Sequence, residues 1–176
     1  MRRDDFVPEA GWQARLELGF ERRGERTVLA HRVHDGPLVV QKALHPEGDA
    51  VCHAIVLHPP AGIAGGDQLR LDVNAAAGAH ALLTTPGAGK WYRTAGPAAS
   101  QRVTIDAADE AVVEWLPQET ILFDGSVADI RWHARLARSA RLVAWDIVCL
   151  GRTGSGERYA KGTARIATRI ERGGRA

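Results

Sequence analysis

Residues 70–83 read RLDVNAAAGAHALL, an alternating apolar and polar segment followed by a small turn and an apolar segment. The same plan recurs in residues 102–114 (RVTIDAADEAVVE) and in residues 132–145 (WHARLARSARLVAW). The turns fall at Ala77-Gly78, Asp109-Glu110 and Arg138-Ser139. A spacing of roughly thirty residues is typical of stacked repeats, whose units cannot bury an apolar face alone.

Outside the repeats, strand patterns also dominate. Leu16, Leu18 and Phe20 alternate with polar residues or glycine, which predicts a strand with one buried face. Continuous apolar runs at 54–57 and 143–150 predict strands buried on both faces. We therefore predict a single, mainly β domain over 1–176, built as a β-solenoid or helicoid of stacked strands. It would have little helix, apart from a short one near 90–94, and a β-sandwich of evenly spaced hairpins is the alternative.

Composition excludes several classes of function. The chain has 176 residues, 45% of them hydrophobic, and a formal net charge of +2, so it can bury a core but has no broad cationic field for nucleic acid. No apolar run reaches the ~18 to 20 residues of a membrane helix. Cys52 and Cys149 do not form a disulfide framework. These features predict a cytoplasmic protein without nucleic-acid or membrane partners.

Catalytic motifs are incomplete. Gly87-Ala88-Gly89-Lys90 resembles part of a Walker loop, but Thr84 and Trp91 occupy the positions of its first Gly and final Ser or Thr. Cys149 lies in an apolar strand, and Ser155 lacks the G-x-S-x-G frame. We expect neither a nucleotide hydrolase nor nucleophilic catalysis.

Four carboxylates are the remaining candidates for chemistry. Glu114, Glu119 and Asp124 lie close in sequence, and Asp146 interrupts an apolar run, where a carboxylate needs a partner or a function. Paired carboxylates serve glycosidases, and carboxylates paired with arginine serve structure. The spacing alone leaves both interpretations open.

Four blocks of sequence carry a family resemblance. They are residues 58–67 (HPPAGIAGGD), 82–93 (LLTTPGAGKWYR), 114–121 (EWLPQETI) and 145–152 (WDIVCLGR). Their order and spacing resemble the UreD (UreH) family of urease accessory proteins, most strongly over 51–162. Residues 164–171 read as the first strand of a hairpin and 172–175 as its turn, so the C-terminal part of the family fold is expected to be missing.

The resemblance implies a non-enzymatic, β-rich scaffold for urease maturation. Its partners would be urease apoprotein and the UreF and UreG accessory proteins, with nickel in transit and no tightly bound cofactor. Loosely held oxygen or imidazole ligands would suit such transit. The candidate nickel path comprises Asp67, Glu114, Glu119, Asp124, Asp146 and, more weakly, Cys149. The candidate partner-facing residues are Pro59, Pro60, Gly65, Gly66, Lys90, Trp91, Tyr92 and Arg93.

Two other functions are compatible with these residues. One is a β-solenoid hydrolase that acts through two of the carboxylates. The other is a plain structural β-module that binds partners without any traffic of metal.

Overall fold

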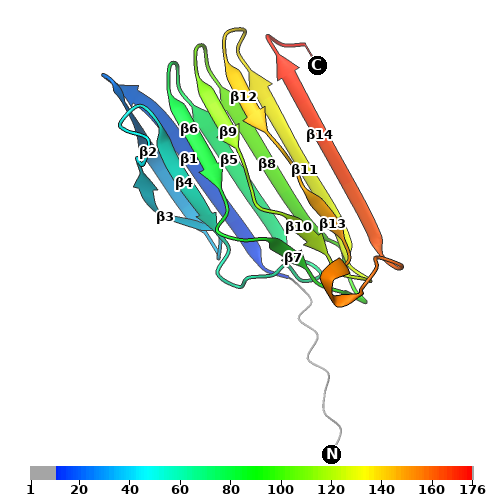
Figure 1. The fold of residues 1–176 in the computed structure, drawn as a ribbon. Coiled ribbons are helices and arrows are strands. Elements are labelled where there is room, and N and C mark those ends of the chain that lie inside the picture. The colour runs from blue at the N-terminus through cyan, green and yellow to red at the C-terminus, as the bar shows by residue number, and fades with distance from the viewer. Residues whose placement is uncertain (1–10, 176) are drawn as a thin grey trace, which may run out of the picture.

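The computed structural model describes residues 11–175, which are built almost entirely of strands (Figure 1). The first seven strands are β1 (Gln13–Arg23), β2 (Arg26–Asp35), β3 (Val39–Leu44), β4 (Cys52–Leu57), β5 (Gln68–Ala75), β6 (His80–Thr84) and β7 (Gly89–Trp91). The next six are β8 (Ala99–Ala107), β9 (Val112–Trp115), β10 (Thr120–Leu122), β11 (Val127–Leu136), β12 (Arg141–Ala144) and β13 (Val148–Leu150). A 3-10 turn, η1 (Thr153–Ser155), precedes β14 (Thr163–Arg172). No helix within 11–175 is long and apolar enough to cross a membrane.

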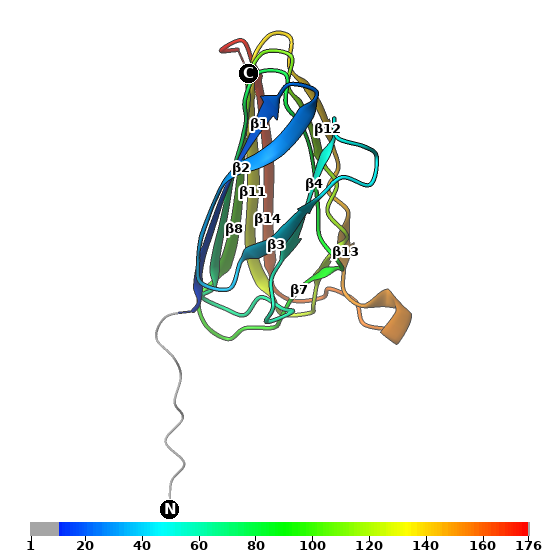
Figure 2. The same cartoon turned by 90° about the vertical axis from the view of Figure 1, so that its left-hand side faces the viewer.

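The strands form two walls (Figure 2). One wall is a six-stranded sheet in the order β14-β11-β8-β5-β1-β2, called the long sheet here. The facing wall has an upper sheet, β12-β9-β6-β4-β3, and a lower sheet, β13-β10-β7. The core lies between the two walls.

The repeats of the sequence are successive coils of a helicoid. Each coil contributes one strand to the long sheet, one to the upper sheet and one to the lower sheet, as in β5-β6-β7, β8-β9-β10 and β11-β12-β13. Neighbouring coils pair in parallel, with Leu71 beside Val103 and Val103 beside Trp132. The predicted solenoid-like stacking is therefore confirmed.

The three predicted turns are also confirmed, and they stack on one another. The N–H of Gly78 donates to the carbonyl of Asp109 at 3.0 Å, and the N–H of Glu110 donates to Ser139 Oγ at 3.0 Å. Gly78 and Glu110 take positive φ angles of 68° and 60°. At Gly78 this conformation carries no steric cost, because glycine has no Cβ.

Alternation along the strands decides which side chains reach the core. In β5, Leu69, Leu71 and Val73 are buried while the residues between them face outward. Since side chains alternate across a strand, a slip of one residue in the parallel register would turn this apolar face to solvent. The coils are thereby held in register by burial.

The apolar run at 143–150 differs from its prediction. It forms two short strands, β12 and β13, rather than one buried strand, and Val143, Trp145 and Leu150 are 51%, 46% and 54% exposed. β12 and β13 are the edge strands of the upper and lower sheets, so no strand of the described chain covers their outer side.

The helix predicted near 90–94 is wrong, and the C-terminal hairpin turn is right. Parallel pairing with β10 holds residues 89–91 extended as β7. Arg172 and Arg175 exchange backbone hydrogen bonds across Gly173-Gly174, and both glycines have positive φ. This geometry is the two-residue hairpin turn that favours Gly-Gly.

Candidate functional site

Two of the sequence blocks meet at the lower end of the molecule. The N–H of Ile63 donates to the carbonyl of Lys90 at 2.7 Å, and the N–H of Tyr92 donates to the carbonyl of Ile63 at 2.9 Å. A Cβ added at Gly62 would lie 2.0 Å from Tyr92 Cε2, so the contact requires glycine. Residues 58–67 and 85–94 thus form one continuous surface, called here the lower loops.

Most of the predicted partner-facing residues reach the surface of the lower loops. Pro59, Pro60, Lys90, Tyr92 and Arg93 are exposed, whereas Gly65 and Gly66 are half-buried. The Tyr92 ring packs edge-on against Phe123, with centroids 5.2 Å apart.

Trp91, which the sequence also placed among the partner-facing residues, is buried. Its side chain is only 2% exposed, because it takes the inward position of β7 and joins the core. The sequence placed it on the partner surface because it belongs to the block at 82–93 that carries the family resemblance.

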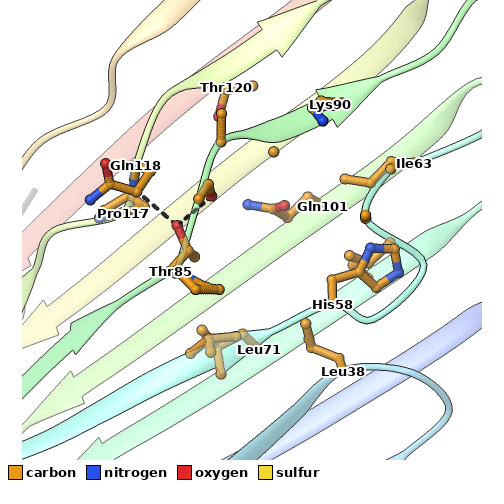
Figure 3. A pocket seen from close by; sticks show the side chains of 18 of the residues that line it. Leu38, His58, Ile63, Leu71, Thr85, Lys90, Gln101, Pro117, Gln118 and Thr120 are labelled. Atoms are coloured by element: carbon orange, nitrogen blue, oxygen red, sulfur yellow. Dashed lines mark hydrogen bonds between the residues drawn. The ribbon is translucent and has the colours of Figure 1, made fainter.

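A cavity of about 360 Å³ opens beside the lower loops (Figure 3). β4 and β6 pair as far as Ile55 and Thr84, after which segments 56–63 and 85–90 separate. The gap between these segments leads to side chains of the long sheet, including Leu71 and Gln101. The cavity is therefore a window in one wall of the helicoid.

Among the described residues that line this cavity, His58 has a ring nitrogen without a hydrogen-bond partner. Its Nε2 is buried and has no hydrogen-bond partner among the described residues. Burial lowers the pKa of His58, and the nearby charge of Asp67 opposes that shift only in part. The imidazole is therefore neutral at pH 7, and it lies across the cavity from Thr85 (Figure 3).

The remaining polar groups around the cavity are uncharged except for one. Thr85 Oγ1 accepts the N–H of Gln118 at 3.0 Å and donates to the carbonyl of Gly87 at 3.1 Å. Gln101 also lines the cavity, and Lys90 lies exposed at its mouth. The sequence did not predict the cavity. The one signal for His58 was its place at the start of the first block, HPPAGIAGGD.

Two carboxylates of the predicted nickel path accept hydrogen bonds from backbone N–H groups. Asp67 is 5% exposed, and its two oxygens accept the N–H groups of Trp12 and Ala64, both at 2.8 Å. Asp124 Oδ1 accepts the N–H groups of Ala160 and Lys161 at 2.8 and 2.7 Å. The bond from Lys161 is the largest of the causes that lower the pKa of Asp124.

The other four candidates belong to the wall that faces the long sheet. Glu114 points outward from β9, where its Oε1 lies 2.7 Å from His80 Nε2. Glu119 is half-buried between β9 and β10, and Cys149 is half-buried on β13. Asp146 is exposed overall, yet desolvation of its carboxyl by the surrounding protein raises its pKa.

The six candidates do not assemble a preformed metal centre. Within 11–175, no group of three or more His, Cys, Asp or Glu side chains could hold an ion. The arrangement is that of separate carboxylates rather than of a closed site, which requires three or four converging ligands. Binding of nickel by any of them stays a prediction.

Comparison with known proteins identifies the family. Residues 13–176 match the sequence model of a family described as UreD urease accessory protein. The chain belongs to the UreD family. A urease accessory protein UreD of Azoarcus sp. (strain BH72) is 60% identical over 167 residues, which cover 95% of this chain and 59% of the relative.

Other UreD relatives show the same partial coverage. The protein of Dechloromonas aromatica (strain RCB) is 56% identical over 161 residues, 92% of this chain and 56% of its own length. That of Cupriavidus pinatubonensis (strain JMP 134 / LMG 1197) is 50% identical over 181 residues, 100% of this chain and 62% of its own. The chain spans about three-fifths of the length of these curated relatives.

The four UreD blocks occupy related places in the helicoid. The first three, within 58–67, 82–93 and 114–121, all contribute residues to the cavity. The fourth, residues 145–152, is the equivalent of the third on the next coil, because Leu122 pairs with Leu150. The UreD signature thus follows the lower part of one wall.

Proposed function

We propose that this UreD chain is a non-catalytic, cytoplasmic scaffold that binds urease apoprotein with the UreF and UreG accessory proteins and supports delivery of nickel to urease. Membership of the UreD family carries the maturation role. The blocks at 58–67 and 82–93 meet through the Gly62–Tyr92 contact and form one exposed surface. This surface supports the binding role.

The lower loops have the properties of a protein-binding surface. Pro59, Pro60 and Pro86 are exposed and restrict their own backbone, so little conformational entropy is lost when a partner binds. Tyr92 and Arg93 are exposed beside them, and both residue types are enriched at interfaces.

A co-expression experiment tests the binding role. A tagged chain is produced with urease apoprotein, UreF and UreG, and the recovered proteins are identified while nickel-dependent urease activity is measured in the same lysate. Recovery of these partners with active urease supports the proposal. A folded chain that recovers none of them contradicts it.

The nickel path is tested separately by substitution. Glu119→Ala and Asp146→Ala are expected to lower urease activation without lowering recovery of the complex, since cargo ligands need not contribute to docking. Glu21→Ala, at an exposed carboxylate of β1, is the matched control. Activation equal to wild type in both variants would remove Glu119 and Asp146 from the path and favour a plain structural module.

A further inference from the structure

The cavity behind the lower loops is poorly suited to a cation. None of its described lining residues is a carboxylate, and its walls are mainly apolar, with Leu71, Val103 and Trp115 among them. The one charged residue that lines it is Lys90, whose ammonium repels a cation at the mouth. Among the described residues, the cavity therefore lacks the carboxylate ligands of the predicted nickel path.

The cavity has the size and chemistry of a pocket for a bulky side chain. Its volume of about 360 Å³ is at the small end of the ~300–1,000 Å³ range of ligand sites. The amide of Gln101 provides a hydrogen-bonding group inside apolar walls. Anchor residues of protein interfaces occupy desolvated pockets of this kind.

The surroundings of the mouth favour a polypeptide as the occupant. The window opens between two loops that are continuous with the exposed Tyr92 and Arg93, so a bound chain would also contact these side chains. Lys90 at the mouth is cationic and complements an acidic segment, whereas Arg93 beside it already faces Asp124 at 3.6 Å. Electrostatic complementarity of this kind orients partners and raises association rates.

We propose that the window between segments 56–63 and 85–90 receives one large apolar side chain from an acidic segment of a partner protein, with Lys90 contacting a carboxylate beside that side chain. This docking site rests on the proposed scaffold function and adds the chemistry of its contact. Gln101 favours a side chain that also carries a hydrogen-bonding group, such as an aromatic one with a polar edge.

Two substitutions with matched controls test the docking site. Ala88→Trp fills the cavity that Ala88 lines, and Ala167→Trp places the same side chain on the exposed outer side of β14. Lys90→Glu reverses the charge at the mouth, and Lys42→Glu makes the same change on the exposed part of β3. Urea denaturation verifies that each variant is folded before affinity is measured against purified urease apoprotein, UreF and UreG.

The expected result is a loss of affinity of about tenfold or more for Ala88→Trp, as for truncation of a hot-spot contact. Lys90→Glu is expected to weaken the same interaction with a steeper dependence on salt, whereas both controls match wild type. If wild type binds its partners and both variants match the controls, the docking site is wrong while the scaffold function stands. If wild type binds no partner, both proposals fall.

A small-molecule site is the competing outcome. The apolar dye anilinonaphthalene sulfonate serves as the probe, since it fits an apolar cavity with a cation at its mouth. Dye binding that Ala88→Trp abolishes, with partner affinity unchanged, would overturn docking in favour of a small-molecule ligand. Reduced partner affinity in the same variant supports docking.

Discussion

Asp67→Ala separates an anchoring role of this carboxylate from a role in nickel transit. In the structure both oxygens of Asp67 accept backbone N–H groups, from Trp12 and Ala64, and tie the loop before β5 to the start of β1. Hydrogen bonds to a charged group contribute about 1.5–3 kcal/mol each, so losing two costs ~3–6 kcal/mol. Trp12 and Ala64 are exposed, so water can reach their N–H groups after the substitution, and we expect the lower end, ~3 kcal/mol.

The assay is equilibrium unfolding in urea, followed by the fluorescence of the five tryptophans. A loss of ~3 kcal/mol corresponds to a fall in Tm of about 6–12 °C for a chain of this size. Asp67→Asn retains one acceptor oxygen and should lose about half as much. Asp35→Ala, at the exposed end of β2, is the control and should stay within ~0.5 kcal/mol of wild type.

One result would refute this reasoning. An Asp67→Ala variant as stable as wild type would show that the two hydrogen bonds do not anchor the loop. If that variant also failed to support urease activation, Asp67 would belong to the nickel path that the sequence suggested.

Three further predictions concern the packing, titration and thiol reactivity of other residues. Gly62→Ala should destabilise the chain by ~1–3 kcal/mol in urea unfolding, because its Cβ would overlap the Tyr92 ring, and an unchanged midpoint would show that the ring moves freely. Burial lowers the folded-state pKa of His58, so the unfolded state binds the proton more readily and wild type loses stability as pH falls through about 6.5. His58→Gln should therefore lose less stability than wild type between pH 7.5 and 5.5. A pH dependence identical to wild type would contradict that assignment. Finally, a thiol reagent should modify the half-buried Cys149 before the buried Cys52, because burial raises the pKa of the Cys52 thiol. Mass spectrometry of peptides follows the order of modification. Modification of Cys52 first would count against the structure.

The strands and turns were predictable because they depend on local pattern. Leu69, Leu71 and Val73 alternate with polar residues, and that period of two places them on one buried face whatever their neighbours are. The turns at 77–78, 109–110 and 138–139 were visible for the same reason. The apolar run at 143–150 was mispredicted, since composition does not distinguish a central strand from an edge strand.

The chemistry of the candidate residues was less predictable than their identity. The sequence placed Asp67 and Asp124 on a candidate nickel path, but in the structure backbone N–H groups from other loops bind their carboxylates. Trp91 lies among exposed residues of its block, yet the inward position of β7 buries it. His58 drew no functional prediction, because an orphaned buried nitrogen can be recognised only from its surroundings.

The sequence by itself determined the repeat, its strands and turns, and the resemblance to the UreD family, all of which are encoded in short stretches of adjacent residues. Only the tertiary structure decided that residues 58–67 meet residues 85–94, that a cavity opens where β4 and β6 separate, and that no three of the described candidate nickel ligands converge on one point. The physical reason is the parallel stacking of coils. It brings together residues some thirty positions apart, and the side chains of several coils jointly set the burial and hydrogen bonding of each site.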